Sequence, residues 1–174
     1  MHKLAIRVDG NRHIGLGHFF RALHLADFLK ELHGVEVCFF LLESSFGRVP
    51  RTFLDKSGHA HAFVSEEQNP WQQDQNRLAS ELTTYAPDVV LTDILEPDPG
   101  DRDLLENCEY SPVDLAQTLS LIRDTGVPIA VVSDRFDAMR MDADLFINTC
   151  PAQQAGWYPE DMQRKYLLGA EAYV

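Results

Sequence analysis

Short runs of hydrophobic residues recur along the chain, and stretches with helical periodicity lie between them. Six runs have the length of β-strands and are rich in β-branched and aromatic residues; they cover residues 3–9, 35–42, 61–64, 88–93, 128–134 and 144–149. Several are apolar at consecutive positions, which is typical of a parallel sheet with both faces covered. The alternation predicts an α/β fold built on a Rossmann-like, doubly wound parallel sheet.

Three helices are predicted between these strands. The first ends at Gly34, and its apolar positions repeat with the spacing of one helix face: Ala22, Leu25, Ala26, Leu29 and Leu32. The other two cover residues 74–87 and 111–126. Residues 65–73 and 96–110 fit neither period, so we expect loops there; the second stretch is acidic but lacks the pattern of a calcium-binding loop.

Length, composition and charge narrow the class of protein. The chain has 174 residues, 45% of them hydrophobic, which is enough for one domain with a sizeable core. The formal charge of −12 argues against a nucleic-acid partner, because such proteins need a basic face. No apolar run has the length of a membrane span, and the N-terminus does not read as a secretory signal, so we expect a cytoplasmic protein. The three cysteines, Cys38, Cys108 and Cys150, lack CxxC spacing and are predicted to be structural thiols.

Polar residues follow the predicted strands at the ends where an open parallel sheet binds its ligands. The first, fourth, fifth and sixth strands end at or near Asp9, Asp93, Asp134 and Asn148. Each of these residues alone could be a helix cap or a turn former. Together they predict a binding site along one edge of the sheet.

A glycine-rich segment, Gly15-Leu16-Gly17, joins the first strand to the first helix. Glycine allows a ligand to come close to the backbone, and the helix that follows presents unpaired N–H groups and the positive end of its dipole. The segment therefore predicts a site for an oxygen-rich, partly negative ligand.

The same region argues against a nicotinamide or flavin cofactor. The third glycine of the dinucleotide-binding pattern is replaced by Phe20, and Glu43 is the only candidate for the acidic residue that holds the ribose. His59 and His61 are two residues apart and could in principle bind a metal, but acidic or thiol partners in register are missing. We therefore predict no cofactor and no metal.

His18 stands at the start of the first helix, where the helix dipole disfavours the protonated imidazole. A neutral imidazole is a usable general base, which contributes about 10²- to 10⁴-fold in rate. A structural role, in which the ring caps the loop, remains equally open. Arg21 lies one turn later, within reach of a phosphate or of an acidic partner such as Asp9. Asp93 and Asp134 could orient sugar hydroxyls or order the glycine loop.

The motif RVDGNRHIGLGHFFRALHLA, residues 7–26, resembles the N-terminal signature of a known family. The family comprises the hydrolases of UDP-2,4-diacetamido-2,4,6-trideoxy-β-L-altropyranose in pseudaminic acid synthesis and the related spore-coat-polysaccharide proteins. The segments PDVVLTD, VVSD and ADLFINTCP are similar to the family's strands that end at Asp93, Asp134 and Asn148, and YLLGAEAYV resembles the family's segment near the interdomain linker.

The resemblance implies a GT-B-type architecture, in which two Rossmann-like domains face each other across a cleft. Residues 1–174 would form the sugar-side domain, and we expect the family's C-terminal, UDP-binding domain to be absent from this chain. His18 aligns with the family's proposed base, which activates water without a metal. The implied substrate contacts are Asp9, Gly15, Leu16, Gly17, Arg21, Asp93, Asp134 and Asn148.

The sequence departs from the hydrolases directly after Asp93, where Ile94 and Leu95 replace a histidine and a functional tyrosine. We therefore expect a nucleotide-sugar hydrolase or a glycosyltransferase-like protein of surface polysaccharide or nonulosonic acid biosynthesis, with His18 activating water or an acceptor hydroxyl at the anomeric carbon of a UDP-sugar. The isolated domain is expected to be inactive. The alternative is a noncatalytic sugar-recognition or partner-docking domain on the same scaffold.

Overall fold

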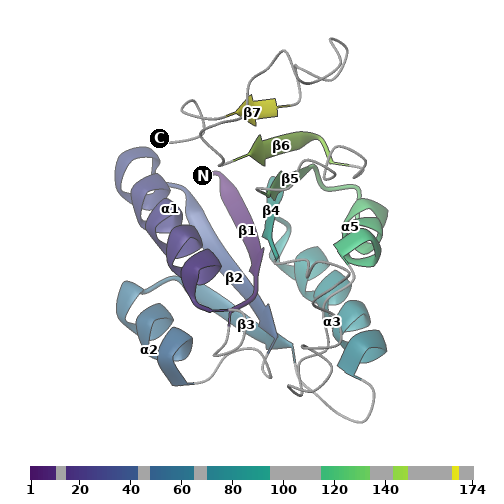
Figure 1. Ribbon diagram of the computed structural model, residues 1–174, viewed down its shortest axis with the longest axis horizontal. Helices are drawn as coiled ribbons and strands as arrows, with labels where there is room; N and C mark the ends of the chain where they lie inside the picture. The colour runs from purple at the N-terminus through teal and green to yellow at the C-terminus, as the bar shows by residue number, and fades with distance from the viewer. Residues whose placement is uncertain are drawn as a thin grey trace.

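A parallel sheet organises the chain in the computed structural model, which describes residues 1–10, 15–42, 48–64, 70–94, 115–133, 143–148 and 166–168. Its seven strands run in the order β3-β2-β1-β4-β5-β6-β7, and every neighbouring pair is parallel (Figure 1). The strands are β1 (Lys3–Val8), β2 (Glu36–Leu42), β3 (Ala60–Val64), β4 (Val89–Asp93), β5 (Ile129–Val132), β6 (Leu145–Asn148) and β7 (Tyr166–Leu168). The helices among the described residues are α1 (Gly17–His33), α2 (Arg48–Ser57), α3 (Pro70–Tyr85) and α5 (Leu115–Asp124).

The strand order reverses between β1 and β4. After β1, the chain adds β2 and then β3 on one side of β1. It then returns to place β4 on the other side of β1, and β5, β6 and β7 follow beyond β4. Such a reversal is the topological switch point of a doubly wound sheet, where ligands bind beyond the carboxyl ends of the strands. The predicted α/β, Rossmann-like class is therefore confirmed.

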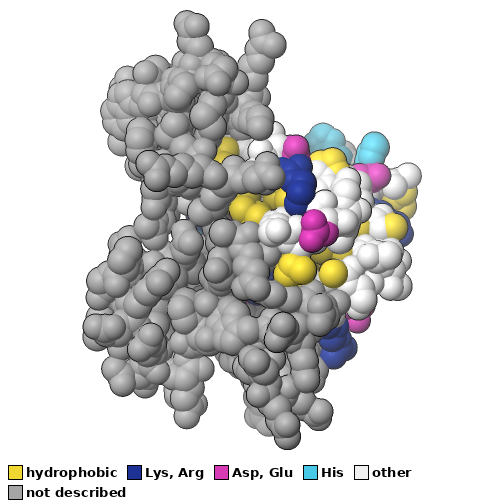
Figure 2. Space-filling view, turned by 90° about the vertical axis from the view of Figure 1, so that its right-hand side faces the viewer, with side chains coloured by type: hydrophobic (Ala, Val, Ile, Leu, Met, Phe, Trp, Pro, Cys, Tyr) yellow, Lys and Arg dark blue, Asp and Glu magenta, His cyan; other side chains and the backbone are white. Residues whose placement is uncertain are grey.

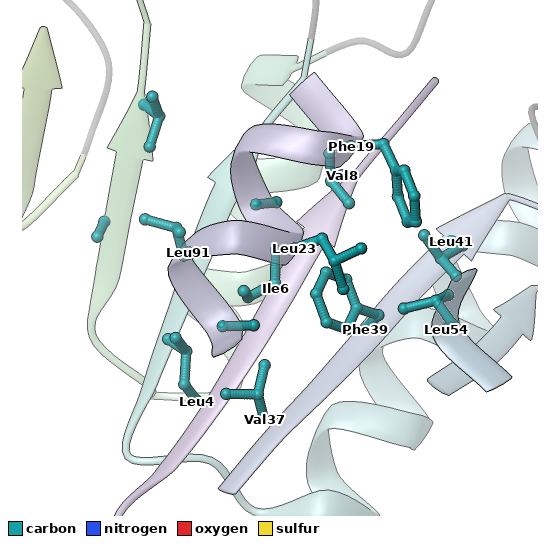
Figure 3. Packing of buried hydrophobic residues seen from close by; sticks show 14 residues of the cluster. Leu4, Ile6, Val8, Phe19, Leu23, Val37, Phe39, Leu41, Leu54 and Leu91 are labelled. Atoms are coloured by element: carbon teal, nitrogen blue, oxygen red, sulfur yellow. The ribbon is translucent and has the colours of Figure 1, made fainter. Parts of the chain in front are cut away.

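Two hydrophobic clusters cover the two faces of the sheet because side chains alternate along each strand. One packs α1 and Leu54 of α2 against Leu4, Ile6 and Val8 of β1 (Figure 3). The other packs α3 and α5 against the opposite face, to which Ala5 of β1 belongs. The helices thus lie in two layers, with the strands between them.

The six strands predicted from the sequence all form, most of them shorter than predicted by one or two residues at an end. The first helix ends as predicted at Gly34, which adopts the left-handed conformation at φ 62°. Cys38 is buried in the core, and burial raises the pKa of its thiol to about 12, as suits a structural thiol. Cys108, Cys150 and the predicted loop 96–110 lie outside the described residues.

The sequence prediction was wrong at three places. Residues 70–73 belong to α3 instead of a loop, because Pro70 occupies the first helical position, which tolerates proline. The short helix α2 was not predicted, since Pro50 interrupts the pattern and few of its residues are apolar. The strand β7 was also missed, because three residues are too few to show a period. Among the described helices, none combines the length and apolar character needed to cross a bilayer.

Candidate functional site

Three charged or titratable side chains meet at the carboxyl ends of β1 and β4. His18 and Arg21 come from the first turns of α1, the helix that follows β1. Asp93 is the last residue of β4 and lies opposite Val8 of β1 in the sheet register. The group therefore occupies the switch point of the sheet, on the face that α1 covers.

Short contacts connect the group, which we name the polar trio: His18, Arg21 and Asp93. His18 Nδ1 lies 2.6 Å from Asp93 Oδ1. Arg21 donates from Nη2 to Oδ1 of Asp93 at 2.6 Å and from Nε to Oδ2 at 2.9 Å. The Asp93 side chain is only 2% exposed, whereas those of His18 and Arg21 are 23% and 38% exposed. The trio thus rests on a buried carboxylate and opens to solvent through His18 and Arg21.

The contact with Asp93 determines which nitrogen of His18 carries a proton. A carboxylate oxygen only accepts, so the 2.6 Å contact with Asp93 pairs with a proton on Nδ1, whereas the 3.0 Å contact with Arg21 Nη2 pairs with a lone pair there. The shorter contact with Asp93 favours the proton on Nδ1. In the neutral ring, Nε2 is then the nitrogen with a lone pair. His18 is consequently an oriented imidazole that can accept a proton at Nε2.

The local chain path explains how His18 and Arg21 reach Asp93. Gly15 has φ 81°, a left-handed conformation that favours glycine, and it turns the chain into α1. The helix then places His18 and Arg21 on one side, three residues apart. Gly10 also suits this path, because a Cβ there would lie 3.1 Å from the carbonyl oxygen of Gly15, closer than most real Cβ contacts. The sequence pattern pointed to Gly15 and Gly17 but not to Gly10. A Cβ at Gly17 would meet no atom within 4 Å, so the space around Gly17 does not require glycine.

Asp9 forms a separate, buried ion pair with Arg7. Arg7 donates from Nη1 to Oδ1 of Asp9 at 2.6 Å and from Nη2 to Oδ2 at 3.0 Å, and the two residues are 2% and 0% exposed. Arg7 points to the face opposite the polar trio, because it alternates with Val8 along β1. Arg21 has an acidic partner, as the sequence suggested, but this partner is Asp93 and not Asp9, and a contact of Arg21 with a phosphate stays a prediction. A role of Asp9 in substrate binding stays a prediction.

The other predicted site residues lie along the same edge of the sheet or outside the described part. Gly15 and Gly17 are exposed, and Leu16 between them is half-buried. Asn148 ends β6 and is 1% exposed; β6 is two strands from β4, a separation of about 10 Å. Asp134 lies outside the described residues. The structure therefore brings together His18, Arg21 and Asp93, whereas Asn148 lies further along the edge.

The paired histidines have structural partners. His59 is buried, and its Nε2 lies 2.8 Å from Oδ1 of Asp27 on α1. His61 Nε2 lies 3.7 Å from Oδ1 of Asp55 on α2. Within the described ranges, no three histidine, cysteine or acidic residues are grouped as a metal site requires.

The described part of the surface on the side of α3 and α5 carries mixed side chains. Figure 2 shows basic, acidic and hydrophobic side chains interspersed over the described part of this face. This mixture differs from the extended basic area that binds a phosphate backbone.

No family model matches this sequence, and no curated protein matches it. Solved structures do match. UGT2 of Phytolacca americana, in its apo form, aligns with a TM-score of 0.51 and 15% identity over 84% of this chain and 30% of that one. The described residues therefore have the Rossmann-like fold of the matched part of that structure. Because the identity is so low, this likeness shows the fold alone.

Two further structures align with lower TM-scores. A UGT transferase from Siraitia grosvenorii in complex with UDP has a TM-score of 0.48 and 12% identity, covering 82% of this chain and 35% of that one. A UDP-glucose-4-epimerase from Stenotrophomonas maltophila, with bound NAD and formylated UDP-arabinopyranose, has a TM-score of 0.49 and 16% identity, covering 87% of this chain and 44% of that one. The chain thus spans less than half the length of each of these three structures.

Proposed function

We propose that this chain is the sugar-side domain of a nucleotide-sugar hydrolase or glycosyltransferase-like enzyme of surface polysaccharide or nonulosonic acid biosynthesis. The observation that carries the proposal is the imidazole of His18, held by Asp93 at 2.6 Å at the switch point of a Rossmann-like sheet. The motif of residues 7–26 supports a UDP-sugar as the substrate class.

In the proposed reaction, Nε2 of His18 accepts a proton from water or from an acceptor hydroxyl. The oxygen attacks the anomeric carbon, the bond from that carbon to the phosphate oxygen breaks, and UDP leaves with the electron pair. Asp93 keeps the ring in the reactive tautomer and faces the imidazolium that forms. A base of this kind contributes about 10²- to 10⁴-fold in rate.

The sugar would lie along the carboxyl edge of the sheet. We propose that it contacts the turn Gly15-Leu16-Gly17 at the start of α1 and Asn148 at the end of β6. Asp9, Arg21, Asp93 and Asp134 complete the proposed binding set. The nucleotide would be held by a second, C-terminal domain, as in the family that the motif resembles.

Ile94 bears on the choice of acceptor. The hydrolases that the motif resembles have a histidine at this position, but Ile94 is 6% exposed and belongs to the core beneath α3 and α5. Position 94 therefore offers no polar group to the site. His18 is therefore the group that we propose for proton transfer. Water and a sugar hydroxyl are both tested as acceptors of the transferred sugar.

The test is release of UDP from a panel of UDP-sugars by the full-length protein, with and without sugar acceptors. We expect His18→Asn to lower turnover about 10²- to 10⁴-fold. His24→Asn is the matched control, because His24 is exposed on the same helix, and should stay within twofold. A His18→Asn rate within a few-fold of wild type would refute the proposal. Binding of UDP-sugars without any release of UDP would favour the noncatalytic sugar-recognition function.

A further inference from the structure

We infer that Arg21 is a positioning residue, whose two donors Nε and Nη2 set the orientation of the Asp93 carboxylate and, through it, the direction of the His18 ring. The inference deepens the proposed function, on which its consequence for turnover rests. It gives Arg21 a task that is separate from the phosphate or substrate contact expected from the sequence.

The sheet fixes the backbone of Asp93 but not its carboxylate. Asp93 is the last residue of β4, and parallel pairing places it opposite Val8 of β1. The terminal torsion of an aspartate side chain is broad and roughly two-fold, so the backbone alone allows many orientations of the two oxygens. A second constraint is therefore needed to point one oxygen at His18.

Arg21 supplies that constraint through two parallel hydrogen bonds. Its Nε donates to Oδ2 of Asp93 at 2.9 Å and its Nη2 donates to Oδ1 at 2.6 Å, so one rigid, planar group holds both oxygens. Two bonds of this kind set the plane of the carboxylate, whereas a single bond leaves it free to turn. The Asp93 side chain is 2% exposed, so water competes little for these contacts.

The oriented carboxylate in turn places the imidazole. Oδ1 of Asp93 lies 2.6 Å from Nδ1 of His18, and Nη2 of Arg21 lies 3.0 Å from the same nitrogen. The atoms Oδ1, Nδ1 and Nη2 thus form a compact triangle, and a rotation of the carboxylate would lengthen its contact with the ring. Because Nε2 lies on the other side of the ring from Nδ1, this contact sets the direction in which Nε2 points.

The pair of donors differs from a point charge, and this difference makes the inference testable. Lysine carries the same charge as arginine but ends in one compact ammonium group, which cannot donate two parallel bonds in a fixed plane. The arginine of β1 does not replace Arg21, because Arg7 pairs with Asp9 and points to the opposite face of the sheet.

Steady-state kinetics of UDP release by the full-length protein test the consequence for turnover. Arg21→Gln should lower kcat about 10²-fold with little change in KM, the loss expected when a catalytic group is displaced by about 1 Å. Arg21→Lys should remain about tenfold or more below the wild type, because it restores the charge but not the pair of donors. An unchanged kcat, with or without a rise in KM, or full recovery in Arg21→Lys, would overturn the inference.

Proton NMR of the full-length protein tests the geometry without a substrate. The Nδ1 proton of His18, assigned by its loss in His18→Asn, should appear downfield of the amide signals because a buried carboxylate holds it. The signal should be lost in Arg21→Gln and Arg21→Lys. It should be retained in the control Lys30→Gln, which removes a positive charge from the last turn of the same helix. A signal that is absent from the wild type, or that persists in either Arg21 variant, would contradict the inference.

Chemical rescue separates positioning from a structural defect. Arg21 is 38% exposed, so a small cation can reach Asp93 from solvent once the side chain is removed. Guanidinium at millimolar concentration should restore part of the activity of Arg21→Ala, which also shows that the variant is folded. Methylammonium has the same charge without the pair of donors and should not restore it. Equal rescue by the two cations would refute a role for the planar pair of donors.

The two proposals can fail separately, because the NMR measurement needs no substrate. If the His18 signal depends on Arg21 but no UDP-sugar is turned over, the proposed function fails and the positioning role stands. If UDP is released but neither the signal nor kcat depends on Arg21, the proposed function stands and the inference fails.

Discussion

Replacement of Asp93 by asparagine perturbs the polar trio with the smallest change in shape. Asp93 accepts three hydrogen bonds, two from Arg21 and one from His18, and each comes from an N–H group. An asparagine side chain has only one oxygen, so in either orientation its NH2 group faces a donor. The substitution therefore breaks at least one contact and removes the carboxylate charge that faces Arg21.

The size of the effect follows from the burial of the pair. Removing one partner of a fully buried ion pair costs about 3–5 kcal/mol. Arg21 is 38% exposed, so water offsets part of this loss, and we expect Asp93→Asn to lower the free energy of unfolding by about 2 kcal/mol. For a chain of this size the melting temperature should fall by about 4–8 °C. UDP release should fall about 10²- to 10⁴-fold, because a neutral amide lacks the charge that faces the imidazolium and can present its NH2 group to Nδ1 in place of an acceptor.

Thermal unfolding and UDP release measured on the same samples provide the assay. Asp55→Asn is the matched control, because Asp55 is 61% exposed and lies 3.7 Å from its partner His61. A pair of this kind contributes less than about 1 kcal/mol. A melting temperature of Asp93→Asn within 1 °C of the wild type, together with a rate of UDP release within a few-fold of it, would contradict this prediction.

Three further predictions concern the scaffold of the site. Gly10→Ala should lower the free energy of unfolding by about 1–3 kcal/mol in chemical denaturation, because its Cβ would lie 3.1 Å from the Gly15 carbonyl oxygen. Phe19→Ala should cost about 3–5 kcal/mol in the same assay, since Phe19 is fully buried beside the site. Cys38 should resist thiol reagents in the folded protein at pH 8, as peptide mass spectrometry can show, because burial raises its pKa to about 12. The pKa of the unfolded thiol is 9.0, so this contribution to stability is intact below pH 9 and is lost as the pH rises toward 12.

Each of these predictions has its own control or contrary result. Gly17→Ala, at a position with open space around it, should leave the stability unchanged or slightly higher. Phe53→Ala, on the exposed side of α2 at 41% exposure, should cost less than about 1 kcal/mol. Equal losses in Gly10→Ala and Gly17→Ala would contradict the close approach described above. Rapid labelling of Cys38 in the folded protein would contradict its burial.

The parts of the fold predicted from the sequence are those with a strong local pattern. Runs such as VVLTD and IAVV predict strands correctly, because buried parallel strands are apolar at successive positions. Elements with weak patterns were missed, among them α2, where Pro50 lies in the first turn, and the start of α3 at Pro70. Local composition carries little information there, and tertiary packing decides the structure.

The candidate site was predicted in outline but not in its contacts. The rule for strand ends correctly placed His18 and Asp93 at one edge of the sheet. The pairing of Asp93 with Arg21 joins residues 72 positions apart, and no periodicity reports such a contact. The pairing of Arg7 with Asp9 was also not predicted. Both side chains are buried by packing on the α3 side of the sheet, and the sequence pattern does not report that packing.

In the proposed mechanism, Nε2 of His18 takes a proton from the oxygen that attacks a sugar bound at the carboxyl edge of the sheet. A crystal structure of the full-length protein with an unreactive UDP-sugar analogue tests it most directly. We expect an oxygen, from water or an acceptor, within about 3.2 Å of His18 Nε2 and in line with the anomeric carbon. A sugar bound away from β1 and β4, or with its anomeric carbon turned from His18 so that no oxygen fits between them, would contradict it.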